Sequence, residues 1–180
     1  MPVIVVGGTG RGVGKTSLLC GLVAGLPELR WTVVKLTSHA HGKDASIMEE
    51  RAPGQHTDTG RYLAAGAYRA LLVMAQDSEL GAVVRRLWEQ IDSNAPLLFE
   101  SNRIVDYCQP DVCLAVDGRS EVADKPSYAK LLARADAVVV RSQADRVEHR
   151  ARPVFHLADM DRISLPLLAW LRERWTGQWS

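Results

Sequence analysis

A glycine-rich stretch near the start of the chain, residues 8–17, has the residue types of a phosphate-binding loop. It reads Gly-Thr-Gly-Arg-Gly-Val-Gly-Lys-Thr-Ser and follows the apolar run Val-Ile-Val-Val at residues 3–6. Glycines let backbone N–H groups approach an anion closely, Lys15 would reach the β- and γ-phosphates, and Thr16 would place its hydroxyl on Mg²⁺. We therefore predict that this loop binds a nucleoside triphosphate with Mg²⁺. The residues expected to contact the nucleotide here are Gly10, Arg11, Gly12, Val13, Gly14, Lys15, Thr16 and Ser17.

The loop departs in one place from the usual pattern G-x-x-x-x-G-K-[ST]. That pattern requires a glycine at position 9, where this chain has Thr9 between two glycines. A glycine-rich turn without a ligand is the alternative interpretation. The surroundings favour a true loop, because a buried strand is expected before it and a helix with an apolar stripe after it.

Two acidic residues follow apolar runs that are expected to be buried strands, Glu100 and Asp117. A phosphoryl-transfer site needs a carboxylate in such a place to hold Mg²⁺ or its water. Asp44 and Asp58, in or beside a long polar segment, are further candidates, and any of these acids could instead be a solvated carboxylate. The predicted catalytic residues are Lys15, Thr16 and Glu100, and the predicted metal ligands are Thr16, Glu100 and Asp117.

Other polar residues are expected to contact the nucleotide. Lys35 and His39 lie where a predicted strand runs into the polar segment, and Arg61 lies in the first turn of a predicted helix. Asp145 follows the predicted strand 137–141, in the place where many guanine-specific proteins have the acid of Asn-Lys-x-Asp. Its carboxylate could read guanine, or it could satisfy the N-terminus of a helix.

Short apolar runs alternate with helical patterns along the chain, which is typical of a parallel sheet with crossover helices. The polar segment 37–57 is expected to be a long loop at the carboxyl edge of the sheet, where ligands bind in open α/β folds. We predict one domain over residues 1–180, a three-layer α/β P-loop NTPase domain whose mostly parallel sheet is flanked by helices. The expected strands are 3–6, 31–36, 69–75, 96–100, 112–117, 137–141 and 154–157, and the expected helices are 15–25, 59–65, 79–91, 127–133 and 163–175.

Composition excludes several classes of partner. The formal net charge is +1 with acids and bases mixed along the chain, so neither nucleic acid nor an anionic membrane is expected. No segment approaches the roughly 18 apolar residues of a membrane span. The three cysteines lack a disulfide-like spacing, and the start has no positively charged region before its short apolar run. We therefore expect a cytoplasmic protein.

Three segments beyond the loop resemble the family of molybdopterin-guanine dinucleotide biosynthesis protein B, or MobB. Residues 35–39 match its Lys-x-Thr-x-His-like stretch, residues 58–67 match its Asp-[Ser/Thr]-x-Arg-x-x-x-Ala-Gly-Ala block, and residues 99–101 correspond to its Val-Glu-Gly-like strand end. The chain has Ser101-Asn102 where the family has a glycine after the acid. The order and spacing agree over the first two thirds of the chain.

The resemblance implies a single-domain protein, dimeric in the family, that binds GTP and hydrolyses it weakly. It also implies an adaptor role beside the nucleotidyltransferase that joins guanosine monophosphate to molybdopterin in molybdenum cofactor synthesis. The residues to which the resemblance assigns roles are Gly12, Gly14, Lys15 and Thr16 for phosphates and Mg²⁺, Glu100 as the strand-end acid, and Lys35, His39 and Arg61 along the same edge.

The loop taken by itself also resembles that of dethiobiotin synthetase, an ATP-dependent carboxylase of a diamine. An ATP-dependent small-molecule ligase or kinase, with the segment 37–57 closing over an acceptor, is therefore the alternative function. The expected cofactors are Mg²⁺ and GTP or ATP.

Overall fold

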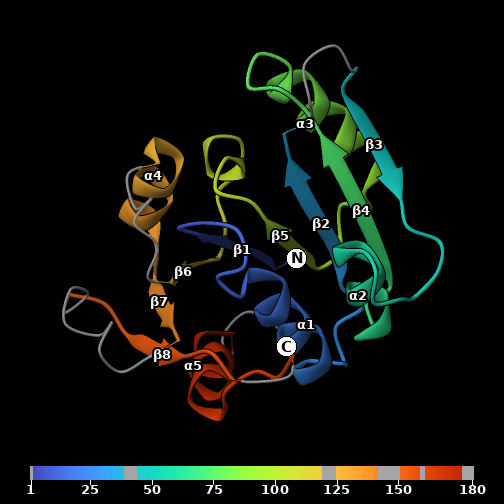
Figure 1. Ribbon diagram of the computed structural model, residues 1–180. Coiled ribbons are helices and arrows are strands. Elements are labelled where there is room, and N and C mark those ends of the chain that lie inside the picture. Colours follow the sequence, from blue (N-terminus) through green and yellow to red (C-terminus); the bar gives the residue numbers. More distant parts are fainter. Residues whose placement is uncertain (1, 39–43, 119–124, 142–150, 159–160, 176–180) are drawn as a thin grey trace.

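An eight-stranded sheet forms the middle of the protein in the computed structural model, which describes residues 2–38, 44–118, 125–141, 151–158 and 161–175 (Figure 1). The strand order is β3-β4-β2-β5-β1-β6-β7-β8. Neighbouring strands run parallel except β3 and β4, which are antiparallel. The strands are β1 (Val3–Gly8), β2 (Thr32–Thr37), β3 (Ser46–Glu49), β4 (Arg69–Met74), β5 (Leu97–Glu100), β6 (Val112–Asp117), β7 (Ala137–Val140) and β8 (Val154–His156).

Helices cover both faces of this sheet. Apolar residues of α1, α2 and α5 pack on one face, and those of α3, α4 and a short 3₁₀ helix pack on the other. None of the helices in the described part of the chain is both long and apolar enough to cross a membrane. The helices are α1 (Lys15–Gly25), α2 (Asp58–Ala64), α3 (Leu80–Gln90), α4 (Pro126–Arg134), α5 (Leu165–Trp175) and the 3₁₀ helix Ile104–Asp106.

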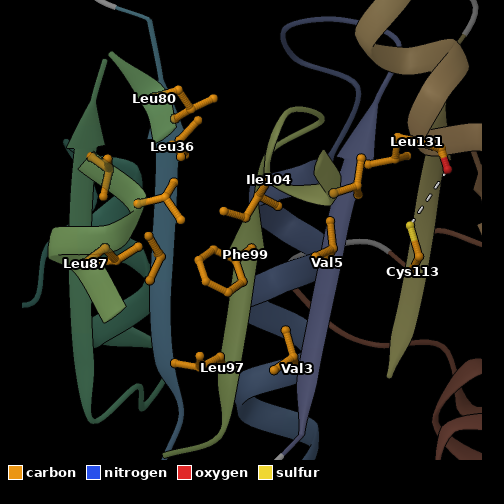
Figure 2. Packing of buried hydrophobic residues seen from close by; sticks show 14 of the residues in the cluster. Val3, Val5, Leu36, Leu80, Leu87, Leu97, Phe99, Ile104, Cys113 and Leu131 are labelled. Carbon is orange, nitrogen blue, oxygen red and sulfur yellow. Dashed lines mark hydrogen bonds between the residues drawn. The ribbon is translucent and has the colours of Figure 1, made fainter. Parts of the chain in front are cut away.

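The central strands are buried on both faces, so their sequences are continuous apolar runs. In β1, Val3 and Val5 join the cluster under α3 and α4, whereas Ile4 and Val6 join the cluster under α1, α2 and α5. Figure 2 shows the first cluster, in which Phe99 of β5 lies among side chains from the neighbouring strands and α3. Successive side chains of a central strand therefore point alternately into the two cores.

The three-layer α/β fold expected from the sequence is confirmed, and each expected strand and helix is present with small differences at its ends. One expectation is wrong in part, because the polar segment 37–57 contains strand β3. Ile47 stands opposite Val73 of β4 and packs against the first core. β3 lies at the edge of the sheet and is only partly buried, which explains why its sequence has no strong strand pattern.

The parallel arrangement brings the carboxyl ends of β2, β5 and β1 side by side at one edge of the sheet. β1 lies beside β6, and the connection after β1 leads to β2 on one side, whereas the connection after β6 leads to β7 on the other. Such a reversal of strand order opens a crevice outside the strand ends, where α/β proteins bind ligands.

Candidate functional site

A cavity of about 720 Å³ lies at this edge, beside the glycine-rich loop that joins β1 to α1. Residues from the loop, the end of β2, the start of α2 and the segment after β5 line it. Among the described residues, its lining includes seven lysine and arginine side chains and two acids, Asp58 and Glu100. This excess of positive charge suits a polyanionic ligand.

The conformation of the loop depends on glycine at two positions. Gly12 has φ 72° and Gly14 has φ 107°, a region that other residues rarely adopt. A Cβ on Gly14 would also collide with the side chain of Leu157. Gly14 caps the N-terminus of α1, and no side chain of the described residues does so, which leaves the first N–H groups of the helix for an anion.

Thr9 replaces the consensus glycine because its side chain holds the loop against β6. The side chain is buried, and its hydroxyl donates to the carbonyl of Gly118 (3.0 Å) and accepts from the N–H of the same residue (3.3 Å). The backbone N–H of Thr9 donates to the carbonyl of Val116 (3.2 Å). The variant at this position is thus a structural attachment of the loop to the neighbouring strand.

Asn102, two residues after Glu100, attaches the other side of the loop. Its Oδ1 accepts from the N–H of Gly8 (2.7 Å) and its Nδ2 donates to the carbonyl of Gly8 (3.0 Å). The side-chain amide therefore pairs with the last residue of β1 as a neighbouring strand would. Sequence reasoning missed this role, although a polar amide directly after a buried strand end was a signal for it.

Glu100 is the centre of the hydrogen-bond network in the cavity. It is 6% exposed, and its Oε2 accepts from the hydroxyls of Thr16 (3.0 Å) and Tyr62. Its Oε1 accepts from the Nζ of Lys35 (3.0 Å), and the same ammonium forms an ion pair with Asp58. Residues of β5, β2, α1 and α2 thus meet at one carboxylate.

The charges in this network stabilise one another. Burial by itself would lower the pKa of Lys35, but the carboxylates of Glu100 and Asp58 outweigh it and raise that pKa above its usual value. Burial would likewise raise the pKa of Asp58, but the Lys35 ammonium outweighs it and lowers that pKa. Burial, together with the nearby charge of Glu100, raises the pKa of Tyr62 well above its usual value, so this hydroxyl stays a donor.

Oxygen atoms of Thr16, Glu100 and Asp58 come together here, and the Asp58 carboxylate also interacts with the Thr16 hydroxyl. Among the described residues, no group of three or more His, Cys, Asp or Glu side chains could hold a metal ion unaided. This donor set fits Mg²⁺, which prefers oxygen ligands and is commonly bound by one or two carboxylates together with substrate phosphates.

Arg61 also lines the cavity and connects three elements. Its Nη2 donates to Ser17 of α1 (3.2 Å) and to Asp161 before α5 (2.6 Å). The hydrogen bond that Arg61 donates to the Asp161 carboxylate raises the pKa of Arg61 above its usual value. Lys15 lies inside the loop, and its Nζ donates to the carbonyl of Gly10 (2.5 Å).

Most of the residues that were predicted from the sequence lie at the cavity. Val13 does not line it, because its side chain is buried in the core under α1. Asp117 does not line it either, and its charge instead acts on Tyr128 of α4, so its role as a metal ligand stays a prediction. His39 and Asp145 lie outside the described residues. The predicted residues that line the cavity are Gly10, Arg11, Gly12, Gly14, Lys15, Thr16, Ser17, Lys35, Arg61 and Glu100.

Alternation along the strands explains why Glu100 reaches the cavity. Phe99 faces the core under α3 and α4, so the next side chain, Glu100, faces α1 and the loop. In β6, Val116 faces the core under α1, so Asp117 faces α4. The two acids follow similar apolar runs but lie on opposite faces of the sheet.

Comparison with known proteins identifies the fold. The sequence matches no protein-family model and no curated protein. The structure is similar to that of LpxK from Aquifex aeolicus in complex with ATP, with 21% identity, a TM-score of 0.52, and coverage of 87% of this chain and 53% of LpxK. The chain therefore spans about half the length of LpxK.

Two structures of MobB from Bacillus subtilis also match, over 99% of this chain and 100% of theirs, with 18% and 19% identity and TM-scores of 0.47. The chain therefore shares the α/β fold of LpxK.

Proposed function

We propose that this protein binds a nucleoside triphosphate with Mg²⁺ and hydrolyses it slowly. The observation that carries the proposal is the contact of the Thr16 hydroxyl with Glu100 (3.0 Å), directly beside Lys15 and the loop. A loop hydroxyl and a strand-end carboxylate in contact are the pair that positions Mg²⁺ in P-loop proteins.

Different residues of the site would stabilise the transferring phosphoryl group and hold the metal ion. N–H groups at the start of α1 and the Lys15 ammonium stabilise negative charge on the transferring group. Burial lowers the pKa of Lys15, so its charge is poorly solvated and gains from contact with a phosphate oxygen. Thr16, Glu100 and Asp58 would hold Mg²⁺ or its water, and the bound ion would neutralise charge on the β- and γ-phosphates. Both carboxylates also form ion pairs with Lys35.

We propose GTP as the nucleotide, with Asp145 as the carboxylate that reads guanine. The support for GTP is the sequence resemblance to MobB, which also suggests a homodimer and a molybdenum cofactor nucleotidyltransferase as partner. The place of Asp145 after the predicted strand 137–141 supports its role, and the composition of the chain supports a cytoplasmic location. In this function the protein would be an adaptor whose nucleotide state controls binding to that enzyme.

One observation favours a second function, an ATP-dependent small-molecule ligase or kinase. The cavity continues past the loop to Thr37, Ser38 and Arg103, which lie at the ends of β2 and β5. These polar side chains offer a place for an acceptor next to the transferring phosphoryl group. A screen for transfer from ATP to diamine and carboxylate acceptors distinguishes this function from simple hydrolysis.

The test of nucleotide binding is a titration with fluorescent GTP and ATP analogues in the presence of Mg²⁺. We expect Lys15→Ala to weaken binding by about 10- to 100-fold, because a charge-assisted hydrogen bond is lost. Lys130→Ala is the matched control, because Lys130 of α4 is 62% exposed, forms an ion pair with Asp106 and does not line the cavity. Equal affinity of Lys15→Ala and the wild type would overturn the proposal.

The choice of nucleotide needs a further variant. If Asp145 reads guanine, Asp145→Ala abolishes the preference for GTP over ATP and leaves the affinity for ATP unchanged. An unchanged preference would remove Asp145 from the proposal.

A further inference from the structure

The ammonium of Lys35 lies among the oxygens that are proposed to hold the metal. Its Nζ contacts Glu100 Oε1 (3.0 Å) and the carboxylate of Asp58, while the Thr16 hydroxyl contacts the other oxygen of Glu100 (3.0 Å). The Lys35 side chain is 22% exposed and that of Glu100 is 6% exposed. A cation of the chain itself thus neutralises the carboxylates of the metal site.

The position of Lys35 is fixed by the sheet. Lys35 of β2 is paired in register with Glu100 of β5, and both side chains point to the face covered by α1 and α2. Asp58 is the first residue of α2, whose N-terminus is held by the hydroxyl of Thr57, which accepts from the N–H of Gly60 (2.9 Å). The two ion pairs of Lys35 therefore join β2, β5 and α2 and do not depend on a surface loop.

Metal and ammonium compete for the same carboxylates. A divalent cation at Glu100 and Asp58 would lie within a few ångströms of the Lys35 charge, and like charges repel strongly where water is partly excluded. A bound triphosphate changes this balance, because it brings several negative charges into a cavity that Lys35 also lines. The Lys35 ammonium can then exchange its carboxylate partners for phosphate oxygens.

We propose that Lys35 blocks the metal site until the triphosphate is bound, so that Mg²⁺ enters only together with the nucleotide. The inference rests on the proposed function, since it concerns the same metal and the same loop. It makes Lys35 a positioning residue with two partners, the carboxylates of Asp58 and Glu100 before binding and the phosphates afterwards. Glu100 keeps its orientation during the exchange, because the hydroxyls of Thr16 and Tyr62 hold its other oxygen.

The experiment measures binding of Mn²⁺, a paramagnetic substitute for Mg²⁺, to the protein without nucleotide. We expect Lys35→Gln to bind Mn²⁺ about tenfold or more tightly than the wild type, because the competing charge is gone. Lys35→Arg keeps the charge and should bind Mn²⁺ as weakly as the wild type. Lys125→Gln is the matched control for net charge, because Lys125 also lines the cavity but has no ion pair with Asp58 or Glu100 among the described contacts.

A double variant and thermal melting test where the metal binds and whether each variant is folded. The gain in Lys35→Gln should disappear when Asp58→Asn is added, which places the new metal at these carboxylates. Thermal melting of each variant verifies that it is folded, and a folded Lys35→Arg keeps the comparison valid if Lys35→Gln unfolds. The inference is overturned if the wild type binds Mn²⁺ alone as tightly as Lys35→Gln, or if Lys125→Gln gives the same gain.

Failure of the underlying function would look different. Nucleotide binding is measured separately, in the presence of Mg²⁺. A wild type that binds no nucleotide refutes the proposed function, whereas a wild type that binds nucleotide, and binds metal equally well without it, refutes only the role of Lys35.

Discussion

Asn102→Ala is expected to destabilise the protein and to weaken nucleotide binding together. The Asn102 amide makes two hydrogen bonds to the backbone of Gly8, at 2.7 and 3.0 Å, at the point where β1 becomes the loop. The Gly8 backbone is buried, so its N–H and carbonyl groups have little access to water once the amide is removed. At about 0.5–1.5 kcal/mol for each hydrogen bond, the free energy of unfolding should fall by about 1–3 kcal/mol.

Asn102→Asp separates the two hydrogen bonds. An aspartate keeps the acceptor for the Gly8 N–H but places a negatively charged oxygen against the Gly8 carbonyl, where the amide had a donor. It also adds negative charge next to the phosphate-binding loop. We therefore expect Asn102→Asp to have a stability similar to that of Asn102→Ala but a lower affinity for the triphosphate.

Urea denaturation gives the free energies of unfolding, and titration with a fluorescent nucleotide analogue gives the affinities. Asn94→Ala is the control, because Asn94 lies on an exposed turn away from the loop. If Asn102→Ala stays within about 0.5 kcal/mol of the wild type, as surface substitutions do, then the amide does not hold the loop. The explanation of the residue after Glu100 would then be wrong.

Three further predictions concern buried groups around the site. Thr9→Val keeps the shape of the side chain but removes the hydroxyl from the Gly118 backbone, so urea denaturation should show a loss of about 1–2 kcal/mol that Thr9→Ser largely avoids. Tyr62→Phe removes a buried donor to a carboxylate and should lower the free energy of unfolding by about 1.5–3 kcal/mol; a melting temperature equal to that of the wild type would contradict this. Burial raises the pKa of Cys20 and Cys113 to about 12, so both thiols should react slowly with a thiol reagent at neutral pH and rapidly after unfolding.

The fold could be predicted from the sequence because most of its strands are buried on both faces. Such strands are short continuous apolar runs, and the helices between them have periodic apolar faces, so each element is recognisable by itself. β3 could not be found in this way. Its stability comes from pairing with β4 and from the contact of Ile47 with the core, and neither is visible in the four residues of the strand.

Site residues that belong to one short sequence motif could be predicted from the sequence. Contacts that depend on which strands are neighbours in the sheet were harder to predict. Lys15 and Thr16 follow directly from the loop pattern. The contact between Lys35 and Glu100 depends on β2 lying next to β5 in a particular register, although the two residues are 65 positions apart. The attachment of the loop by Asn102 depends in the same way on β5 lying next to β1.

The alternation of side chains along a strand distinguishes two acids that the apolar runs alone do not. Glu100 ends β5 and Asp117 ends β6, the two neighbours of β1, and each follows a run of apolar residues. Because successive side chains point to opposite faces of the sheet, the face of each acid follows from the face of the buried residue before it. The loop enters α1, so only an acid on the α1 face can meet the loop hydroxyl. Glu100 satisfies this condition and Asp117 does not, and the same count places Lys35 on the α1 face, where it reaches Glu100.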